Sequence, residues 1–365
     1  MRGSNETARQ ALTVAVATGT PVLLWGPPGT GKTASVRAIA RALALECEVV
    51  IASIHDPTDF SGLPVVEAGE VRLAPPAWSR RLADAGRGVL FLDELTTAPP
   101  AVQAALLRVV LERTVGDLAL GEGVAVVAAA NPPDQAAEGW DISAPLANRF
   151  CHLDWVPDPC GFAAGLAAGW PDPEVVDVPA HWEARLPAAR GVIGGFITAR
   201  PDLACVLPSG SAAGRAWPSP RSWEAACRLW AAADAAGVGP EVRAALVAGT
   251  VGEGAAAELV SWHSKLDLPD PERVLADPRR CRLPVRPDRL FAVLSAVAAA
   301  VVAEPTVARW EAGSVVLGRA AGDCPDAAAI AGRLLSSCRP PGARPDPSLA
   351  SLAPVLRASG LLGAA

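Results

Sequence analysis

The stretch "GPPGTGKT", residues 26 to 33, decides how the first half of the chain folds. It follows the apolar segment "PVLLW" and opens the helical pattern "KTASVRAIARALAL". All eight residues fit the phosphate-loop pattern G-x-x-x-x-G-K-[ST], which requires a strand before it and a helix after it. Backbone N–H groups of such a loop and the helix N-terminus hold phosphate oxygens. The residues predicted to bind the phosphates are Gly26, Pro27, Pro28, Gly29, Thr30, Gly31, Lys32 and Thr33.

Two side chains of this loop have separate predicted roles. Lys32 supplies a point charge for the β and γ phosphates, and Thr33 supplies a hydroxyl for Mg²⁺. The alternative is a Gly/Pro turn that fits the pattern by chance. The chain has only two lysines, Lys32 and Lys265, and one of them occupies the single position that demands lysine. The sequence therefore predicts a site for ATP with Mg²⁺.

A pair of acids ends the apolar strand pattern of residues 88–92. Ligands of parallel sheets bind outside the carboxyl ends of the strands. We therefore expect Asp93 to hold Mg²⁺ together with Thr33, and Glu94 to orient and deprotonate a water. The alternative is a solvated acidic strand end. We favour the catalytic role because we expect this strand to neighbour the strand of the phosphate loop.

Three more polar residues are candidates for the same chemistry. Asn131 ends the strand pattern 124–130 and is expected to reach both the γ-phosphate and the water, although an Asn-Pro turn is the alternative. Arg149, in "LANRF", is a surface cation in a monomer, but in a ring it could enter the neighbour's site. Arg221, in "PSPRSWEAA", lies near a helix start, where the dipole disfavours a cation. An external anion or plain solvation would explain Arg221.

The order of elements predicts an α/β core followed by helices. Strands at 21–25, 48–54, 88–92, 124–130 and 151–155 alternate with helices, which indicates a parallel sheet covered on both faces. Beyond residue 156 the pattern is helical, with helices near 181–199, 221–236, 241–265 and 286–303. We expect three domains: a nucleotide-binding core at 1–156, a helical lid at 157–265 and a helical C-terminal extension at 266–365.

One segment, at about residues 59–76, interrupts the core without carrying polar chemistry. "LPVVE", a turn at Ala68-Gly69 and "EVRLA" predict a hairpin bracketed by prolines. We expect it to act as a lever that contacts a partner. The alternative is a hairpin that merely extends the sheet.

Composition limits the other classes of function. The formal charge of −6 gives no reason to expect nucleic acid or an anionic membrane. The longest apolar run, residues 291–303, is too short to span a bilayer and predicts a buried helix. The eight cysteines include no C-x-x-C pair, and Cys151, His152 and Cys160 lack the spacing of a structural zinc site. We expect a soluble cytoplasmic protein with free thiols.

In this order the motifs resemble those of an AAA+ ATPase. Residues 26–33 match Walker A, Asp93-Glu94 Walker B, Asn131 sensor 1, Arg149 the arginine finger and Arg221 sensor 2. More narrowly, "DPTDFSG", "LDELTTAPPAVQAALLRVVLERTVG" and "SPR" resemble elements of the MoxR family. The resemblance covers about residues 5 to 230, and the C-terminal 100 residues match nothing specific.

The resemblance implies a ring, usually a hexamer, with ATP sites at subunit boundaries. It also implies chaperone-like activation of a partner, often a von Willebrand factor A domain protein or a metalloenzyme. Two other functions use the same core: a nucleic-acid motor or loader, and a nucleotide-gated scaffold with slow turnover. The acidic balance and the lack of a recognisable DNA-binding module make nucleic acid an unlikely partner.

Overall fold

The computed structural model describes residues 4–132, 139–265 and 268–352 and contains two compact units. The sheet unit consists of residues 1–179 and 205–256, and the helical unit of residues 180–204 and 257–365. This grouping differs from the three consecutive domains expected above, whose boundaries stay a prediction. In the described part of the chain, no helix is long and apolar enough to cross a membrane.

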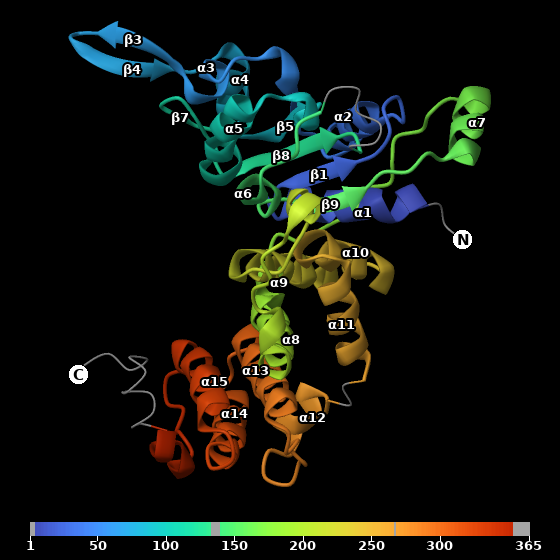
Figure 1. Cartoon of the computed structure of the whole chain (residues 1–365). Helices are drawn as coiled ribbons and strands as arrows, with labels where there is room; N and C mark the ends of the chain where they lie inside the picture. Colours follow the sequence, from blue (N-terminus) through green and yellow to red (C-terminus); the bar gives the residue numbers. More distant parts are fainter. Residues whose placement is uncertain (1–3, 133–138, 266–267, 353–365) are drawn as a thin grey trace. The chain divides into compact units, whose positions relative to one another are not determined.

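Five parallel strands form the centre of the sheet unit (Figure 1). They are β1 (Val22–Trp25), β2 (Glu46–Ile51), β5 (Arg87–Asp93), β8 (Gly123–Ala130) and β9 (Cys151–Asp154). Their order is β2-β5-β8-β1-β9, so β8 lies between the phosphate-loop strand β1 and the acidic strand β5. The expectation that β1 and β5 are neighbours is wrong. The carboxyl ends of all five strands still meet at one edge, because every pairing is parallel.

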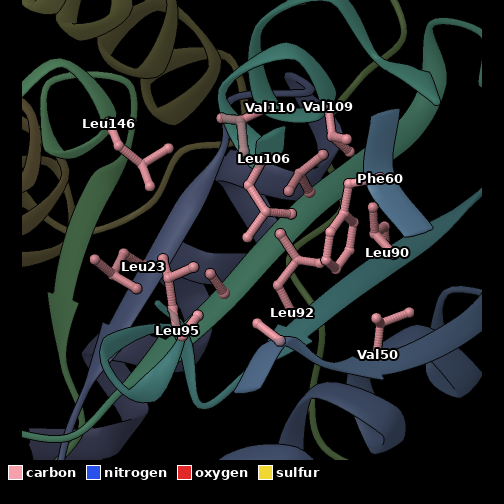
Figure 2. Close-up of a cluster of buried hydrophobic side chains, with 14 of the residues drawn as sticks. Leu23, Val50, Phe60, Leu90, Leu92, Leu95, Leu106, Val109, Val110 and Leu146 are labelled. Carbon is pink, nitrogen blue, oxygen red and sulfur yellow. The ribbon is translucent and has the colours of Figure 1, made fainter. Parts of the chain in front are cut away.

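Strands β1, β5 and β8 are buried on both faces, as the sequence predicts, while the edge strand β2 is largely half-buried. Along β5, successive residues from Gly88 to Leu92 are buried, although they point alternately to opposite faces. The helices of this part are α1 (Ser4–Ala17), α2 (Lys32–Ala42), α3 (Thr58–Ser61), α4 (Ala77–Ala85), α5 (Pro100–Glu112) and α6 (Ala144–Ala147). Figure 2 shows one core, where Phe60 of α3 lies beside Leu90 and Leu92 of the sheet. The predicted α/β parallel-sheet core is confirmed.

After β9, the regular structure of the described residues is helical. The helices are α7 (Pro159–Ala168), α8 (Leu186–Ala199), α9 (Pro220–Ala235), α10 (Pro240–Val251), α11 (Glu253–Ser264), α12 (Pro271–Ala276), α13 (Pro287–Ala303), α14 (Val307–Ala320) and α15 (Pro325–Ser337). Short 3₁₀ turns are η1 (Ala52–Ile54), η2 (Leu95–Thr97), η4 (Trp182–Arg185), η5 (Pro201–Leu203), η6 (Gly210–Gly214) and η7 (Pro347–Leu352). The helix predicted at 241–265 is broken at Gly252, whose φ of 84° no helix can contain. The apolar run at 291–303 lies in α13, which is buried as predicted.

The predicted hairpin is present as β3 (Leu63–Glu67) and β4 (Glu70–Ala74). It forms a separate two-stranded sheet, so the alternative that it extends the main sheet is wrong. Ala68 and Gly69 both have positive φ, 52° and 86°, as a tight hairpin turn requires. Val66 and Val71 lie opposite each other near the turn and are 75% and 70% exposed. The hairpin extends away from the parallel sheet (Figure 1).

The base of the hairpin is fixed by a second, much shorter hairpin, β6 (Thr114–Val115) and β7 (Leu118–Ala119). Leu73 N–H donates to Asp117 Oδ2 at 2.9 Å, and Asp117 N–H donates to the carbonyl of Leu73 at 3.0 Å. Two glycines allow this approach, because a Cβ on Gly62 would lie 2.6 Å from the Cα of Gly116. The turn after α5 therefore holds the base of the β3–β4 hairpin.

The two glycines of the β3–β4 hairpin give a matched pair of variants. Gly62 and Gly69 have nearly the same φ, 87° and 86°, but a Cβ on Gly69 would meet no atom within 4 Å. We expect Gly69→Ala to lower the free energy of unfolding by about 1 kcal/mol through backbone strain alone. Gly62→Ala should lower it by about 1–3 kcal/mol more, because the methyl group collides with backbone. Urea unfolding of both variants measures the difference, and equal losses would contradict the tight base.

Candidate functional site

The phosphate loop begins where β1 ends and is held by the strands around it. Gly26 N–H donates to the carbonyl of Ala130 at 3.2 Å, and the indole of Trp155 donates to the carbonyl of Thr30 at 3.2 Å. Gly31 has φ 84°, and α2 starts at the next residue. A Cβ on Gly29 or Gly31 would meet no protein atom within 4 Å, so the space over the loop is open. An anion can therefore approach the backbone at the start of α2.

Lys32 is buried, with 7% of its surface exposed. Its Nζ donates to the carbonyls of Gly26 at 2.6 Å and Pro27 at 2.9 Å and to Asn131 Oδ1 at 3.0 Å. All three acceptors are neutral, and no carboxylate forms an ion pair with Lys32 among the described residues. Burial lowers the pKa of Lys32, although the negative charge of Asp93 acts in the opposite direction. The site holds a desolvated cation with no direct counter-ion.

Thr33 and Asp93, the two residues predicted to hold Mg²⁺, are in contact with each other. Thr33 Oγ1 donates to Asp93 Oδ2 at 2.6 Å, and Glu94 N–H donates to Asp93 Oδ1 at 3.0 Å. A hydroxyl and a carboxylate are hard oxygen ligands of the kind that Mg²⁺ takes together with phosphate oxygens. These donors and the open glycine loop fit a nucleotide with Mg²⁺.

Glu94 is held in an unusual conformation directly after β5. Its φ of 57° and ψ of 42° are left-handed, which is strained for a residue with a side chain. Its carboxylate Oε2 accepts a hydrogen bond from Ser53 Oγ at 2.9 Å. Sequence reasoning missed Ser53. It follows β2, whose last residue Ile51 pairs with Asp93, so the sheet register alone brings the hydroxyl to Glu94.

The two candidate arginines form a second cluster. Arg149 follows α6, and its guanidinium donates to the carbonyl of Pro145, while its Nε is buried without an acceptor. Burial lowers the pKa of Arg149 most, and the positive charge of Arg221 lowers it further. Arg221 is exposed in the first turn of α9. Among the described residues, neither arginine is hydrogen-bonded to Lys32 or Asp93, and Arg221 lies near enough to Arg149 to act on its charge.

A buried histidine connects the two clusters. Trp25, just before the phosphate loop, donates its indole N–H to His152 Nδ1 at 2.8 Å. The proton of His152 is therefore on Nε2, which donates to the carbonyl of Ala147 at 2.9 Å. Burial lowers the pKa of His152 to about 4. Trp25 is 4% exposed and packs in the core.

Cys151, His152 and Cys160, which were considered as metal ligands, differ in their burial and in their hydrogen bonds. Cys151 is buried, and burial raises the pKa of its thiol to about 12. Cys160 is exposed, and both ring nitrogens of His152 already have partners. Within residues 4–132, 139–265 and 268–352, no group of three His, Cys, Asp or Glu side chains suits a metal ion.

Known proteins are similar in sequence to the part of the chain that holds the phosphate loop. The sequence profile of the AAA domain (dynein-related subfamily) matches residues 21–150. The protein MoxR of Methylorubrum extorquens is 37% identical over 110 residues, which cover 30% of this chain and 32% of MoxR. The Psp operon transcriptional activator of Escherichia coli is 37% identical over 123 residues, which cover 30% of this chain and 37% of the activator.

A crystal structure of a candidate ATPase from Cytophaga hutchinsonii is 18% identical and covers 73% of this chain and 93% of that chain. The TM-score of this match is 0.42. The matched region spans about a third of the length of the two bacterial relatives, 32% and 37%.

The fold and the loop together define the class: residues 21–150 match the AAA domain and carry a phosphate loop at the carboxyl edge of a parallel sheet. Within that class the chain is similar to the MoxR family of AAA+ ATPases. The resemblance predicted from the motifs is confirmed.

The buried histidine predicts how stability depends on pH. The pKa of His152 falls from 6.5 to about 4 in the folded chain, so the unfolded chain binds more protons between these values. Stability is therefore lost as the pH falls through this window. Between pH 7 and pH 4, the titration of His152 lowers the free energy of unfolding by about 3 kcal/mol.

Urea unfolding of wild type and His152→Gln at several pH values measures this contribution. We expect the wild type to be the more stable at pH 7 and its advantage to shrink by about 3 kcal/mol at pH 4, because glutamine does not titrate there. His181→Gln, at an exposed histidine, is the control for the chemical change from histidine to glutamine. A constant difference between wild type and His152→Gln would show that His152 titrates normally.

Proposed function

We propose that this protein hydrolyses ATP to ADP and phosphate. The observation that carries the proposal is the buried Lys32, whose acceptors are neutral and which lies below an open glycine loop. A triphosphate would supply the missing negative charge. Lys32 and the loop hold the phosphates, and Thr33 and Asp93 hold Mg²⁺, which would neutralise charge on the phosphates when bound.

Glu94 is proposed as the general base. Its left-handed backbone aims the carboxylate at the edge of the sheet, and the hydroxyl of Ser53 fixes one carboxylate oxygen. Proton abstraction by a positioned carboxylate requires such a fixed geometry. Asn131, which already touches Lys32, is placed to orient the water or the terminal phosphate.

We also propose a ring, usually a hexamer, in which Arg149 and Arg221 serve a site at a subunit boundary. Both are cations without a carboxylate partner among the described residues, and neither is bonded to the phosphate loop of its own chain. An arginine that neutralises charge on transferred phosphate can raise the rate by several orders of magnitude. A neighbouring chain would provide the phosphate.

The proposed biological role is chaperone-like remodelling or activation of a partner protein. The β3–β4 hairpin supports this role, because its tip exposes Val66 and Val71 and its base is fixed to the turn after α5. A von Willebrand factor A domain protein or a metalloenzyme is the proposed kind of partner, from the resemblance to the MoxR family. The eight free thiols fit a reducing compartment, so we propose the cytoplasm as the location.

Variants at the two lysines and at Glu94 test the proposed hydrolysis. Lys32→Ala should abolish nucleotide binding, while Lys265→Ala, at the exposed second lysine, is the matched control and should keep wild-type turnover. Glu94→Gln should bind ATP and lower kcat about 10²–10⁴-fold, because it removes the general base. Phosphate release and equilibrium binding of a fluorescent ATP analogue measure the two steps.

The same assay tests the ring. Turnover per subunit should rise with protein concentration until rings form, since Arg149 acts on a neighbour. Full turnover in a strictly monomeric sample would contradict the role of Arg149 in trans. Absence of turnover in the wild type at every concentration would contradict the proposed hydrolysis itself.

Replacing residues 65–72 with a short Gly/Ser turn tests the hairpin. The replacement keeps the two hydrogen bonds between Leu73 and Asp117 at the base of the hairpin. ATP turnover should therefore survive, while activation of the partner is lost. The partner is first isolated on the Glu94→Gln variant with ATP, which holds the bound state. The double variant Val66→Ser/Val71→Ser should have the same effect with the hairpin intact. Unchanged activation in both variants would show that the hairpin does not contact the partner.

A further inference from the structure

Asn148, the residue before Arg149, is buried, with 5% of its surface exposed. Its side-chain amide makes two hydrogen bonds to a segment about 70 residues away in the sequence. Its Oδ1 accepts from Ser219 Oγ at 2.7 Å, and its Nδ2 donates to the carbonyl of Trp217 at 3.1 Å. A buried amide is expensive to place without such partners, so this contact fixes both segments.

Ser219 is the N-cap of α9, the helix that carries Arg221. Its Oγ accepts from Ser222 N–H at 3.1 Å, and Ser222 Oγ accepts from Ser219 N–H at 2.8 Å, which completes a capping box. Arg221 lies between the two serines, so its backbone is fixed by the box. The amide of Asn148 thus holds the start of α9 at a set position relative to Arg149.

The other side of Asn148 is fixed as well. The carbonyl of Ala147 accepts the proton of His152 Nε2 at 2.9 Å, and His152 is anchored to Trp25. The segment that ends in Arg149 is therefore held from β9 on one side and from the capping box on the other.

This arrangement brings two positive charges close together. Arg221 is near enough to disfavour the charge of Arg149, and neither has a carboxylate partner among the described residues. Repulsion alone would separate them. The buried Asn148 link opposes that separation, and a bound polyanion would remove the repulsion.

We propose that Asn148 is a positioning residue that holds Arg149 and Arg221 as one cationic pair, ready for the phosphates of a nucleotide. The inference rests on the proposed hydrolysis, in which both arginines serve a phosphate. It goes further by assigning their spacing to the side-chain amide of Asn148, the residue before Arg149 in "LANRF".

The main variant is Asn148→Ala, and the chain offers a close control. Asn5 is also a buried asparagine of the sheet unit, 4% exposed, with two hydrogen bonds to the backbone of Val156. Asn5→Ala should therefore lower the melting temperature by a similar amount without touching the arginines. We expect Asn148→Ala to lower kcat about 10–100-fold and to leave the KM for ATP within about threefold, because misplacement of a catalytic group affects the reaction step most. Asn5→Ala should keep kcat within about twofold.

Two variants of Ser219 remove the same link from the other side. Ser219→Gly keeps a tolerated N-cap but loses the hydroxyl that donates to Asn148, and Ser219→Thr retains the hydroxyl. Ser219→Gly should repeat the loss of kcat, and Ser219→Thr should restore it to near the wild-type value. These variants keep the test valid if Asn148→Ala does not fold.

A double-mutant cycle of Arg149→Gln and Arg221→Gln, followed by urea unfolding, tests the pairing without ATP. In the wild-type background the two shifts in the unfolding midpoint should not add, because each substitution relieves the same repulsion. In the Asn148→Ala background they should add. Additive shifts in both backgrounds, or a kcat of Asn148→Ala equal to that of Asn5→Ala, would overturn the inference. If the wild type does not hydrolyse ATP, the proposed function fails, and this cycle alone decides the role of Asn148.

Discussion

The ammonium group of Lys32 is buried at the carboxyl edge of the sheet, and its three hydrogen-bond acceptors are neutral oxygens. Burial disfavours a charged group unless an opposite charge compensates for the lost water. Asp93 supplies part of that compensation from a distance but does not form an ion pair with Lys32. The remaining positive charge of Lys32 is the reason we propose an anion site at this edge of the sheet. The open glycine loop leaves room for an anion beside Lys32, and the positive end of the α2 dipole also favours negative charge there.

The parallel sheet places polar residues around Lys32, because the carboxyl ends of its strands lie at one edge. Lys32 follows β1, Asp93 ends β5 and Asn131 follows β8, and hydrogen bonds connect the loop to the residues of the other two strands. Ser53 adds a fourth contribution from the end of β2. A catalytic group on a strand end has little freedom, because the strand on each side fixes its backbone. Directly after β5, the backbone of Glu94 departs from strand geometry and is left-handed.

Much of this could be predicted from the sequence, because the signals are local. The phosphate loop, the five strands and the hairpin turn at Ala68-Gly69 are each set by neighbouring residues. The order of the strands was not predictable in the same way: nothing near β5 indicates that β8 separates it from β1. Ser53 and Asn148 were missed for a related reason. Their partners lie 41 and 71 residues away, and a lone serine or asparagine carries no periodic signal. The break between α10 and α11 depends on one glycine, Gly252, which a helical pattern tolerates.

The contact between Gly62 and Gly116 joins two parts of the chain that look independent in the sequence. The β3–β4 hairpin can touch the turn after α5 only because neither glycine has a side chain, and the backbone of Leu73 pairs with Asp117. Residues 59–76 and residues 113–120 are therefore one structural module encoded in two pieces. A chimera that moves the hairpin into a related protein has to carry both pieces. The hairpin alone would lose the backbone contacts of Leu73 with Asp117 and of Gly62 with Gly116.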